Sequence, residues 1–562
     1  MIKKLRWQIL IVCLTLVIVA AILFVPDPGQ KVFEPQPSAG GAYTEALVGS
    51  LSRLNPLLDQ NNSADRDVNR LLFSGLMTFD SRGIPVPDLA DSWGVSQDGT
   101  IYNFSLRSNA LWQDGKPVTV DDVTFTLDLI KSDSSLFPAD VRAMWKQVQI
   151  KKLNESTIQF ILPEPFAPFL DYLTFGLLPR HLLADITADK LSSADFNLAP
   201  VGTGPYRFER LLVENGHVTG VQLHSSENYY GKKALIDQVI FKYFPDASSA
   251  YEAYRQGQVM AISQITPDIL GKALADPTLN VYTGRLPELS MILFNLNDPE
   301  VPFFQDAKLR LALLTGLNRQ QIIAKTLSGQ AIIADGPLFP GTWAYYQNPN
   351  PVVYDPTSAI GLLKSADYKI PANGGDIRTD KDGKSIEFTL IYPDDSLHAQ
   401  IAKIIQSNWT LLGVKVTLEA VKYDSLVNDR LVGRNYQAAL VDLNLMRTPD
   451  PDPYPFWHQS EATGGQNYSQ WDNRSASEYL EQARVDPNII TRTRLYRNFQ
   501  VIFEKELPAL PLYYPVYSYG VSQTVHNVQI PPLFDTSDRF LTINEWYIVT
   551  RRSLSETAQP TP

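Results

Sequence analysis

Hydrophobic and polar residues alternate regularly in three stretches of the chain, and each stretch predicts strands joined to helices. In the first, residues 93–95 lead through a turn at residues 98–99 into the alternating strand 100–106. Residues 120–130 then repeat apolar side chains at helical spacing, and Thr119 has the character of a capping residue at the start of this helix. This first region is therefore predicted to be α+β.

The second and third stretches alternate strands with helices. In residues 238–263, a strand leads through Asp246, as the N-cap, into a helix that Gly257 closes, and a short strand follows. Residues 385–442 give strand, helix, strand, helix and strand, with Gly413 ending the first helix. Such alternation predicts βαβ crossovers and a mostly parallel sheet covered by helices, which is an α/β fold.

The N-terminus carries an apolar run from residue 9 to residue 25 behind basic residues at positions 3, 4 and 6. This is the pattern of a signal segment whose positive end stays in the cytoplasm, so the chain beyond it is predicted to be exported. We favour an uncleaved transmembrane anchor over residues 1–25, although small residues near Ala20 also allow cleavage. Cys13 lies inside the apolar run, which argues against lipidation.

Composition limits the remaining possibilities. A chain of 562 residues with 44% hydrophobic content is too long for one core and predicts two or three lobes. Its net charge of -11 argues against a nucleic-acid partner. Residues 26–41, rich in Pro, Gly and Ser, read as a linker, and residues 551–562 as a disordered tail.

No residue pattern indicates catalysis or a cofactor. The only cysteine is Cys13, so the folded part has no thiol for a disulfide, a thiolate metal site or a nucleophile. None of the six histidines is paired at helical spacing, and no phosphate-binding Gly-Lys-Ser/Thr loop is present. Residues 376–383 lack the spacing of a calcium loop and read as a hairpin turn. The sequence predicts no enzyme, no metal and no cofactor.

A series of short motifs resembles the family 5 extracellular solute-binding proteins of ABC importers, which include dipeptide, oligopeptide and nickel receptors. The resemblance covers residues 42–550 and is most specific in the block around Trp112. The motifs are Leu54-Asn55-Pro56, the residues 72–76, Pro87-Asp88-Leu89-Ala90-Asp91-Ser92-Trp93, the residues 102–107, Trp112-Gln113-Asp114-Gly115-Lys116-Pro117-Val118-Thr119, Gly202-Thr203-Gly204-Pro205-Tyr206 and Asp450-Pro451-Asp452-Pro453.

The resemblance implies a periplasmic-binding-protein-like two-lobe clamp of type II with an extra α+β lobe, preceded by the N-terminal transmembrane helix. The chain would cross between lobes near Leu289 and Pro511, which would form the hinge. The implied lobes are lobe one, residues 42–85 with 200–288 and 512–550; lobe two, residues 86–199; and lobe three, residues 289–511.

The resemblance also places polar ligand contacts. Peptide receptors of this family hold the ligand's amino terminus with an aspartate just before the aspartate-proline loop. The corresponding position here is Arg447, which suits a carboxylate, unless an insertion lets Asp442 take the role. A surface ion pair for Arg447 and a capping role for Asp442 remain open. Asn61 and Asn62 lie where the family contacts the ligand backbone, and the alternative is a polar turn.

Aromatic side chains are the other candidate ligand contacts, because they supply rigid apolar area. Trp343, Tyr345 and Tyr346 lie in a region that often borders the cleft in this family. Tyr454, Phe456 and Trp457 follow the aspartate-proline loop. Burial in a core is the alternative for each of them.

The resemblance implies a monomeric receptor outside the cytoplasm that delivers a solute, by default a peptide, to the permease subunits of an ABC transporter. Two alternatives remain: a membrane-tethered sensor or structural protein with the same fold, and, more remotely, an exported hydrolase.

Overall fold

The computed structural model describes residues 14–15, 33–372, 374–444 and 450–554. Within these residues, no helix is long and apolar enough to cross a membrane. The predicted anchor over residues 1–25 lies outside the described residues, apart from residues 14 and 15. So does the first part of the predicted linker.

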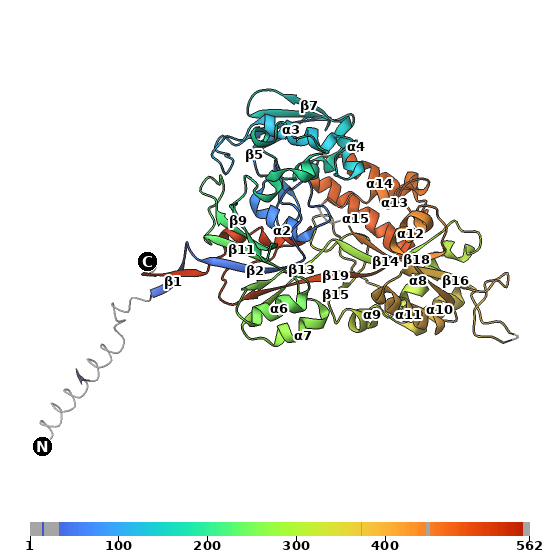
Figure 1. Cartoon of the computed structure of the whole chain (residues 1–562). Helices are drawn as coiled ribbons and strands as arrows, with labels where there is room; N and C mark the ends of the chain where they lie inside the picture. The colour runs from blue at the N-terminus through green and yellow to red at the C-terminus, as the bar shows by residue number, and fades with distance from the viewer. Residues whose placement is uncertain (1–13, 16–32, 373, 445–449, 555–562) are drawn as a thin grey trace, which may run out of the picture.

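A long mixed sheet forms the centre of the molecule (Figure 1). In the described part of the chain its strands lie in the order β17-β16-β18-β14-β19-β12-β2-β11-β10-β9, with β13 and β15 also paired to β19. The bounds are β2 Ala42–Val48, β9 Tyr206–Glu214, β10 His217–Ser225, β11 Gln238–Phe244, β12 Ala261–Ile262, β13 Leu279–Arg285, β14 Glu288–Phe294, β15 Ala331–Ile333, β16 Glu387–Pro393, β17 Lys415–Val421, β18 Ala438–Asn444 and β19 Ala509–Ser522.

Both βαβ patterns are confirmed. β11 and β12 run parallel to β2 on its two sides, and α6 (Ala247–Arg255) connects them with Asp246 as its N-cap. β17 and β18 run parallel to β16; α11 (Ser396–Thr410) joins β16 to β17, and residues 423–431 carry the second, shorter helical connection from β17 to β18. The sheet is nevertheless not mostly parallel, because β14 pairs antiparallel with both β18 and β19.

The expected α+β region forms a separate antiparallel sheet in the order β5-β6-β8-β7. Its helix α3 (Val120–Lys131) begins at a capping box in which the Thr119 backbone N–H donates to Asp122 Oδ2 at 2.9 Å. The remaining bounds here are β5 Ala90–Val95, β6 Ile101–Leu106, β7 Gln149–Lys152, β8 Thr157–Ile161, α4 Ala139–Gln147 and the 3₁₀ helix η1 Ala167–Leu173.

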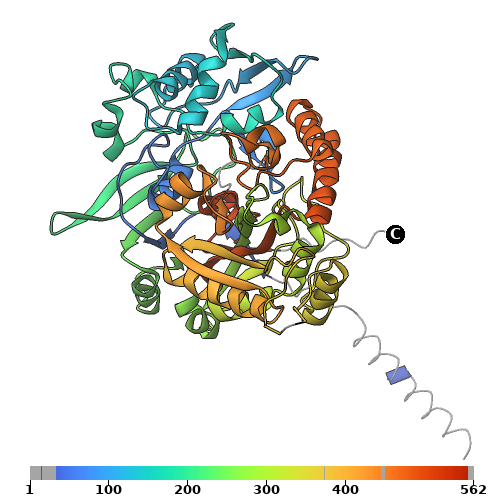
Figure 2. The ribbon, with the colours of Figure 1, turned by 90° about the vertical axis from the view of Figure 1, so that its right-hand side faces the viewer.

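Figures 1 and 2 show that α3 and α4 lie at the opposite end of the molecule from α6 and α7. Within residues 289–511, α11 packs against β16 and β17, α8 packs against α10, and α14 packs against α15. The bounds of the other helices used below are α2 Ser63–Leu72, α7 Pro267–Ala275, α8 Ala307–Thr315, α9 Arg319–Thr326, α10 Pro356–Ser365, α14 Arg474–Val485, α15 Ile489–Glu506 and the 3₁₀ helix η7 Thr536–Phe540.

The buried apolar side chains form distinct cores. One core contains only residues between Leu289 and Tyr514. A second core combines residues from Tyr43 to Ala261 with residues from Tyr517 to Trp546, so the sheet β5-β6-β8-β7 shares its core with the first lobe's strands. Strand β19 passes from one core to the other, pairing with β14 near Pro511 and with β13 from Val516 onward.

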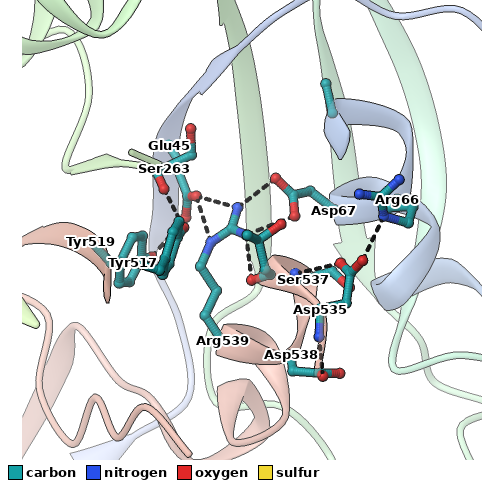
Figure 3. Close-up of polar contacts among 12 residues, drawn as sticks. Glu45, Arg66, Asp67, Ser263, Tyr517, Tyr519, Asp535, Ser537, Asp538 and Arg539 are labelled. Atoms are coloured by element: carbon teal, nitrogen blue, oxygen red, sulfur yellow. Dashed lines mark hydrogen bonds and ion pairs between the residues drawn. The ribbon is translucent and has the colours of Figure 1, made fainter. Parts of the chain in front are cut away.

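A charged cluster is buried in the second core (Figure 3). Arg539, from η7, donates to Glu45 of β2 at 2.7 Å and to Asp67 of α2 at 2.6 Å. Tyr43 and Tyr519 also donate to Glu45. Burial alone would lower the pKa of Arg539, but the charges of Asp67 and Glu45 hold it well above its ordinary value. The cluster ties the C-terminal segment to the start of the fold.

The two ends of the described fold meet. β1 (Phe33–Ser38) pairs antiparallel with β20 (Val549–Leu554). Residues 33–38 are thus a strand within the predicted linker, and the predicted disorder is wrong for residues 551–554. Polar composition does not exclude a strand when a partner strand supplies the backbone hydrogen bonds.

Candidate functional site

A cavity of about 470 Å³ lies among residues of lobe three, at the carboxyl ends of three parallel strands. β16, β17 and β18 end at Pro393, Val421 and Asn444, and the residues at these ends or just after them line the cavity. Crevices at the carboxyl ends of parallel strands commonly bind ligands, because the loops there converge while the sheet holds them rigidly. We call this space the carboxyl-end cavity.

The walls of the cavity are mainly apolar. One wall is a π-helical segment, Leu426–Leu431, which follows the short helix α12 (Tyr423–Ser425) and contributes Leu426, Val427 and Leu431. Such segments occur frequently at functional sites. Another part of the lining comes from Trp457, in α13 (Tyr454–Trp457), and from its neighbours. The complete lining is Met291, Leu293, Pro393, Asp394, Asp395, His398, Tyr423, Leu426, Val427, Leu431, Val441, Asp442, Leu443, Asn444, Phe456, Trp457, Gln466, Tyr468 and Ser469.

One side of the cavity is charged. Asp395 is the N-cap of α11, accepting from the His398 backbone N–H at 2.9 Å, and its other oxygen lies 2.6 Å from His398 Nδ1. His398 Nε2 lies 3.0 Å from Asp442 Oδ2. A protonated ring donates to both carboxylates, so His398 bridges the end of β18 to the start of α11.

The pKa values of His398, Asp395 and the neighbouring Glu288 are all shifted. Burial alone would lower the pKa of His398, but the hydrogen bond and charge of Asp442, with those of Asp395, raise it above its ordinary value. Burial opposes ionisation of Asp395, yet the His398 backbone N–H and ring lower its pKa. Burial, and then the charge of Asp442, raise the pKa of Glu288 on the neighbouring strand β14. The imidazolium and two ionised carboxylates therefore stabilise one another.

Three of the sequence-predicted residues, Asp442, Phe456 and Trp457, line the carboxyl-end cavity. Tyr454 stacks on His458 with a ring-centroid distance of 4.0 Å. The guanidinium of Arg484 lies over the Tyr454 ring, 4.4 Å from its centroid. Tyr454 does not line the cavity. Arg447 lies outside the described residues.

The other aromatic candidates lie elsewhere in lobe three. Arg492 lies 4.9 Å from the ring centroid of Trp343, and Arg497 lies 4.7 Å from that of Tyr346. Tyr345 is half-buried, and burial, with the charge of Asp335, raises its pKa. The backbone N–H of Trp343 donates to the carbonyl of Arg82 in lobe one at 3.2 Å. Trp343 thus borders lobe one, and ligand contact by any of the three aromatics stays a prediction.

The two asparagines belong to the start of α2. Asn62 is its N-cap, accepting from the backbone N–H groups of Ala64 and Asp65. Asn61, the preceding residue, is exposed. Asn62 is therefore committed to a capping role, while contact with a solute stays a prediction for both.

The aspartate-proline loop is tied to lobe two. The Asp450 backbone N–H donates to Asp171 Oδ2 at 2.6 Å, and the Asp450 carboxylate pairs with Arg492 at 2.6 Å. Burial, and then the charge of Asp450, raise the pKa of Asp171 well above its ordinary value. Asp450 is therefore bound to Arg492, and η1 of lobe two packs against lobe three at this point.

Several cavity residues were missed from the sequence. Asp394, Asp395 and His398 follow a predicted strand of the same sheet as Asp442, and their position at a carboxyl end was the signal that could have identified them. No comparable pattern in the sequence indicated that the π-helical segment Leu426–Leu431 lines a cavity. Within the described residues, no group of His, Cys, Asp and Glu side chains could hold a metal ion.

The arrangement of fold and cavity defines a solute-binding protein with the α/β periplasmic-binding-protein fold, and comparison with known proteins identifies its family. Residues 85–466 match the family model described as bacterial extracellular solute-binding proteins, family 5. The chain belongs to this family of non-enzymatic, extracytoplasmic solute-binding proteins.

Known relatives match over most of their length. The chain is 24% identical to the dipeptide-binding protein of Escherichia coli over 503 residues, covering 83% of this chain and 90% of the relative. The structure of the oligopeptide-binding protein AppA from Bacillus subtilis in complex with a nonapeptide is 23% identical, covers 92% of this chain and 100% of that chain, and has a TM-score of 0.65. MppA, a periplasmic murein tripeptide-binding protein in an unliganded open form, is 20% identical, with coverage of 92% and 99% and a TM-score of 0.76.

Proposed function

We propose that this protein captures a peptide-like solute outside the cytoplasm and delivers it to the permease of an ABC importer, tethered to the membrane by residues 1–25. The observation that carries the proposal is the carboxyl-end cavity in a chain that belongs to family 5. The names of the relatives support a peptide as the solute, since they include dipeptide-, oligopeptide- and tripeptide-binding proteins.

The proposed hinge lies between lobe three and a unit formed by lobes one and two. The division of the apolar cores supports this, because lobe three has its own core whereas lobes one and two share one. The two chain crossings are neighbours, since Met291 of β14 pairs with Pro511 of β19. Two adjacent strands can act as a hinge with little disruption of either core.

Closure over a solute would be a rotation of lobe three about the crossing of β14 and β19, and it would change the contact that the Asp450 backbone N–H makes with Asp171 of lobe two. Binding of the solute would then select the closed state.

Spin labels can test the closure in the full chain reconstituted in lipid nanodiscs, on a Cys13→Ser background. Val213→Cys in lobe one and Leu411→Cys in lobe three place labels at exposed positions, with side chains 57% and 69% exposed. A mixture of di- to pentapeptides should shorten the distance between these labels. The control pair, Leu411→Cys with Ile490→Cys, lies within lobe three and away from the cavity lining, with the Ile490 side chain 78% exposed, and its distance should not change. Peptide binding without shortening would contradict the clamp, and no peptide binding would contradict the peptide assignment.

A further inference from the structure

The carboxyl-end cavity has an uneven distribution of charge. Asp394, Asp395 and Asp442 line it, whereas His398 is the only lining residue among those described that can carry a positive charge. For the described lining residues, three carboxylates against one imidazolium leave a net charge of −2 when His398 is protonated and −3 when it is neutral. Partly enclosed carboxylates attract a cation more strongly than fully solvated ones, because less water screens them.

His398 does not satisfy all three carboxylates. Its two ring nitrogens contact one oxygen of Asp395 and one oxygen of Asp442. The side chain of Asp442 is still 48% exposed, and Asp394 is exposed at the end of β16. Glu288, whose Oε1 accepts from Asn444 Nδ2 at 2.8 Å, adds a further carboxyl group beside Asp442. A cationic group of a solute could therefore contact Asp394 and Asp442 without displacing the histidine.

The apolar lining residues of the cavity favour an apolar group. Trp457 is buried and packs against Phe503 with a ring-centroid distance of 4.8 Å, so its position is fixed from behind. Leu431 is buried, and Val427 is half-buried on the same π-helical segment. A volume of about 470 Å³ falls within the range of small-ligand sites and accommodates a large side chain of a solute.

We propose that the carboxyl-end cavity selects solutes that carry a cationic group next to a bulky apolar group, with the cation facing Asp394 and Asp442 and the apolar group facing Trp457 and Leu431. This inference rests on the proposed function, because it assigns the side-chain preference of the same receptor. Every peptide has an amino terminus, so the preference concerns an additional cation, such as a lysine or arginine side chain or a basic group on an aromatic ring.

Competitive capture tests the inference. The full chain in nanodiscs is incubated with an equimolar library of di- to pentapeptides, and in parallel with a panel of phenylalkylamines and phenylalkanoic acids of matched length. Bound molecules are identified by mass spectrometry after rapid filtration. The Asp394→Asn/Asp442→Asn variant retains the shape of both side chains without their charge. Asp424→Asn is the control, because Asp424 is exposed next to Tyr423 but does not line the cavity.

We expect the wild-type protein to enrich peptides with both a basic and a large apolar side chain, and phenylalkylamines over the matched acids. This enrichment should be at least about fivefold lower in the Asp394→Asn/Asp442→Asn variant than in the wild-type protein. The Asp424→Asn variant should show the wild-type enrichment. Enrichment of the amines without any peptide binding would support the inference and contradict the peptide assignment. Enrichment of acidic molecules would overturn it and favour Arg447 as the anchor. An enrichment that the double variant leaves unchanged, or binding to neither panel, would also overturn it.

Discussion

Carboxylates meet a cation in very different surroundings in the cluster around Arg539 in lobe one and in the carboxyl-end cavity in lobe three. Around Arg539, the arginine and Glu45 are fully buried, and each oxygen of Asp67 accepts a hydrogen bond from the guanidinium (Figure 3). In the cavity, His398 is mostly buried, but Asp395 and Asp442 are each about half exposed, at 47% and 48%.

The difference separates a structural role from a binding role. A guanidinium presents a fixed fork that stays charged at any accessible pH and can satisfy two carboxylates completely. An imidazole offers two nitrogens, loses its charge near neutral pH and leaves carboxylate oxygens available to a solute. The lobe-one cluster therefore holds the fold together, whereas the lobe-three carboxylates remain able to bind a ligand.

The largest effect that would sharpen this comparison is expected from Arg539→Met. The substitution leaves Glu45 and Asp67 buried without their cation, and breaking a buried pair in this way costs about 3–5 kcal/mol. The urea concentration at the midpoint of unfolding should fall accordingly. The control is Arg494→Met, at an exposed position of α15, which should change the free energy of unfolding by less than about 0.5 kcal/mol. Equal midpoints for the two variants would contradict a structural role for the cluster.

A smaller effect on stability, but a clear effect on binding, is expected from Val427→Trp. Val427 lines the carboxyl-end cavity, so an indole placed there would occupy the space of the solute's apolar group. The affinity for captured solutes should fall at least about tenfold, equivalent to about 1.4 kcal/mol, measured by calorimetric titration. The control, Val432→Trp, lies just beyond the π-helical segment with its side chain 55% exposed and should bind normally. Normal binding by Val427→Trp would show that the solute occupies another part of the protein.

The features that could be predicted from the sequence are local ones. The capping box at Thr119 and the N-cap at Asp246 depend on residues a few positions apart, so the chain itself carries the information. The parallel arrangement of β16, β17 and β18 followed from alternating strand and helix patterns.

The features that were missed depend on distant parts of the chain or on fine backbone geometry. His398 and Asp442 are 44 residues apart and meet only because β16 and β18 end at the same edge of the sheet. The antiparallel insertion of β14 and β19 into that sheet comes from strands outside the predicted repeat. A π-helical turn differs from an α-helical one in the spacing of its backbone hydrogen bonds, which the pattern of side chains does not reveal.

The smallest effect concerns pH and His398. The folded-state pKa of His398 is raised, so its protonation stabilises the fold fully below the unfolded-state pKa of about 6.5, and this contribution is lost as the pH rises through the folded-state value. We expect less than about 1 kcal/mol, because its partners Asp395 and Asp442 are about half exposed. Urea midpoints between about pH 5.5 and 8.5 should show this decline in the wild-type protein and not in His398→Gln.

Binding of a cationic solute should have the opposite dependence on pH. The groups facing His398 are Asp395 at the start of its own helix and Asp442 on β18, with Asp394, Glu288 on β14 and Tyr513 on β19 nearby. Loss of the imidazolium proton makes this surface more negative, so affinity for a cation should rise over the same pH range in which stability falls. His217→Gln, at an exposed position of β10, should behave like the wild-type protein in both measurements. An affinity that falls together with stability would mean that His398 itself contacts the solute as a cation, and the cavity would then favour an anionic group.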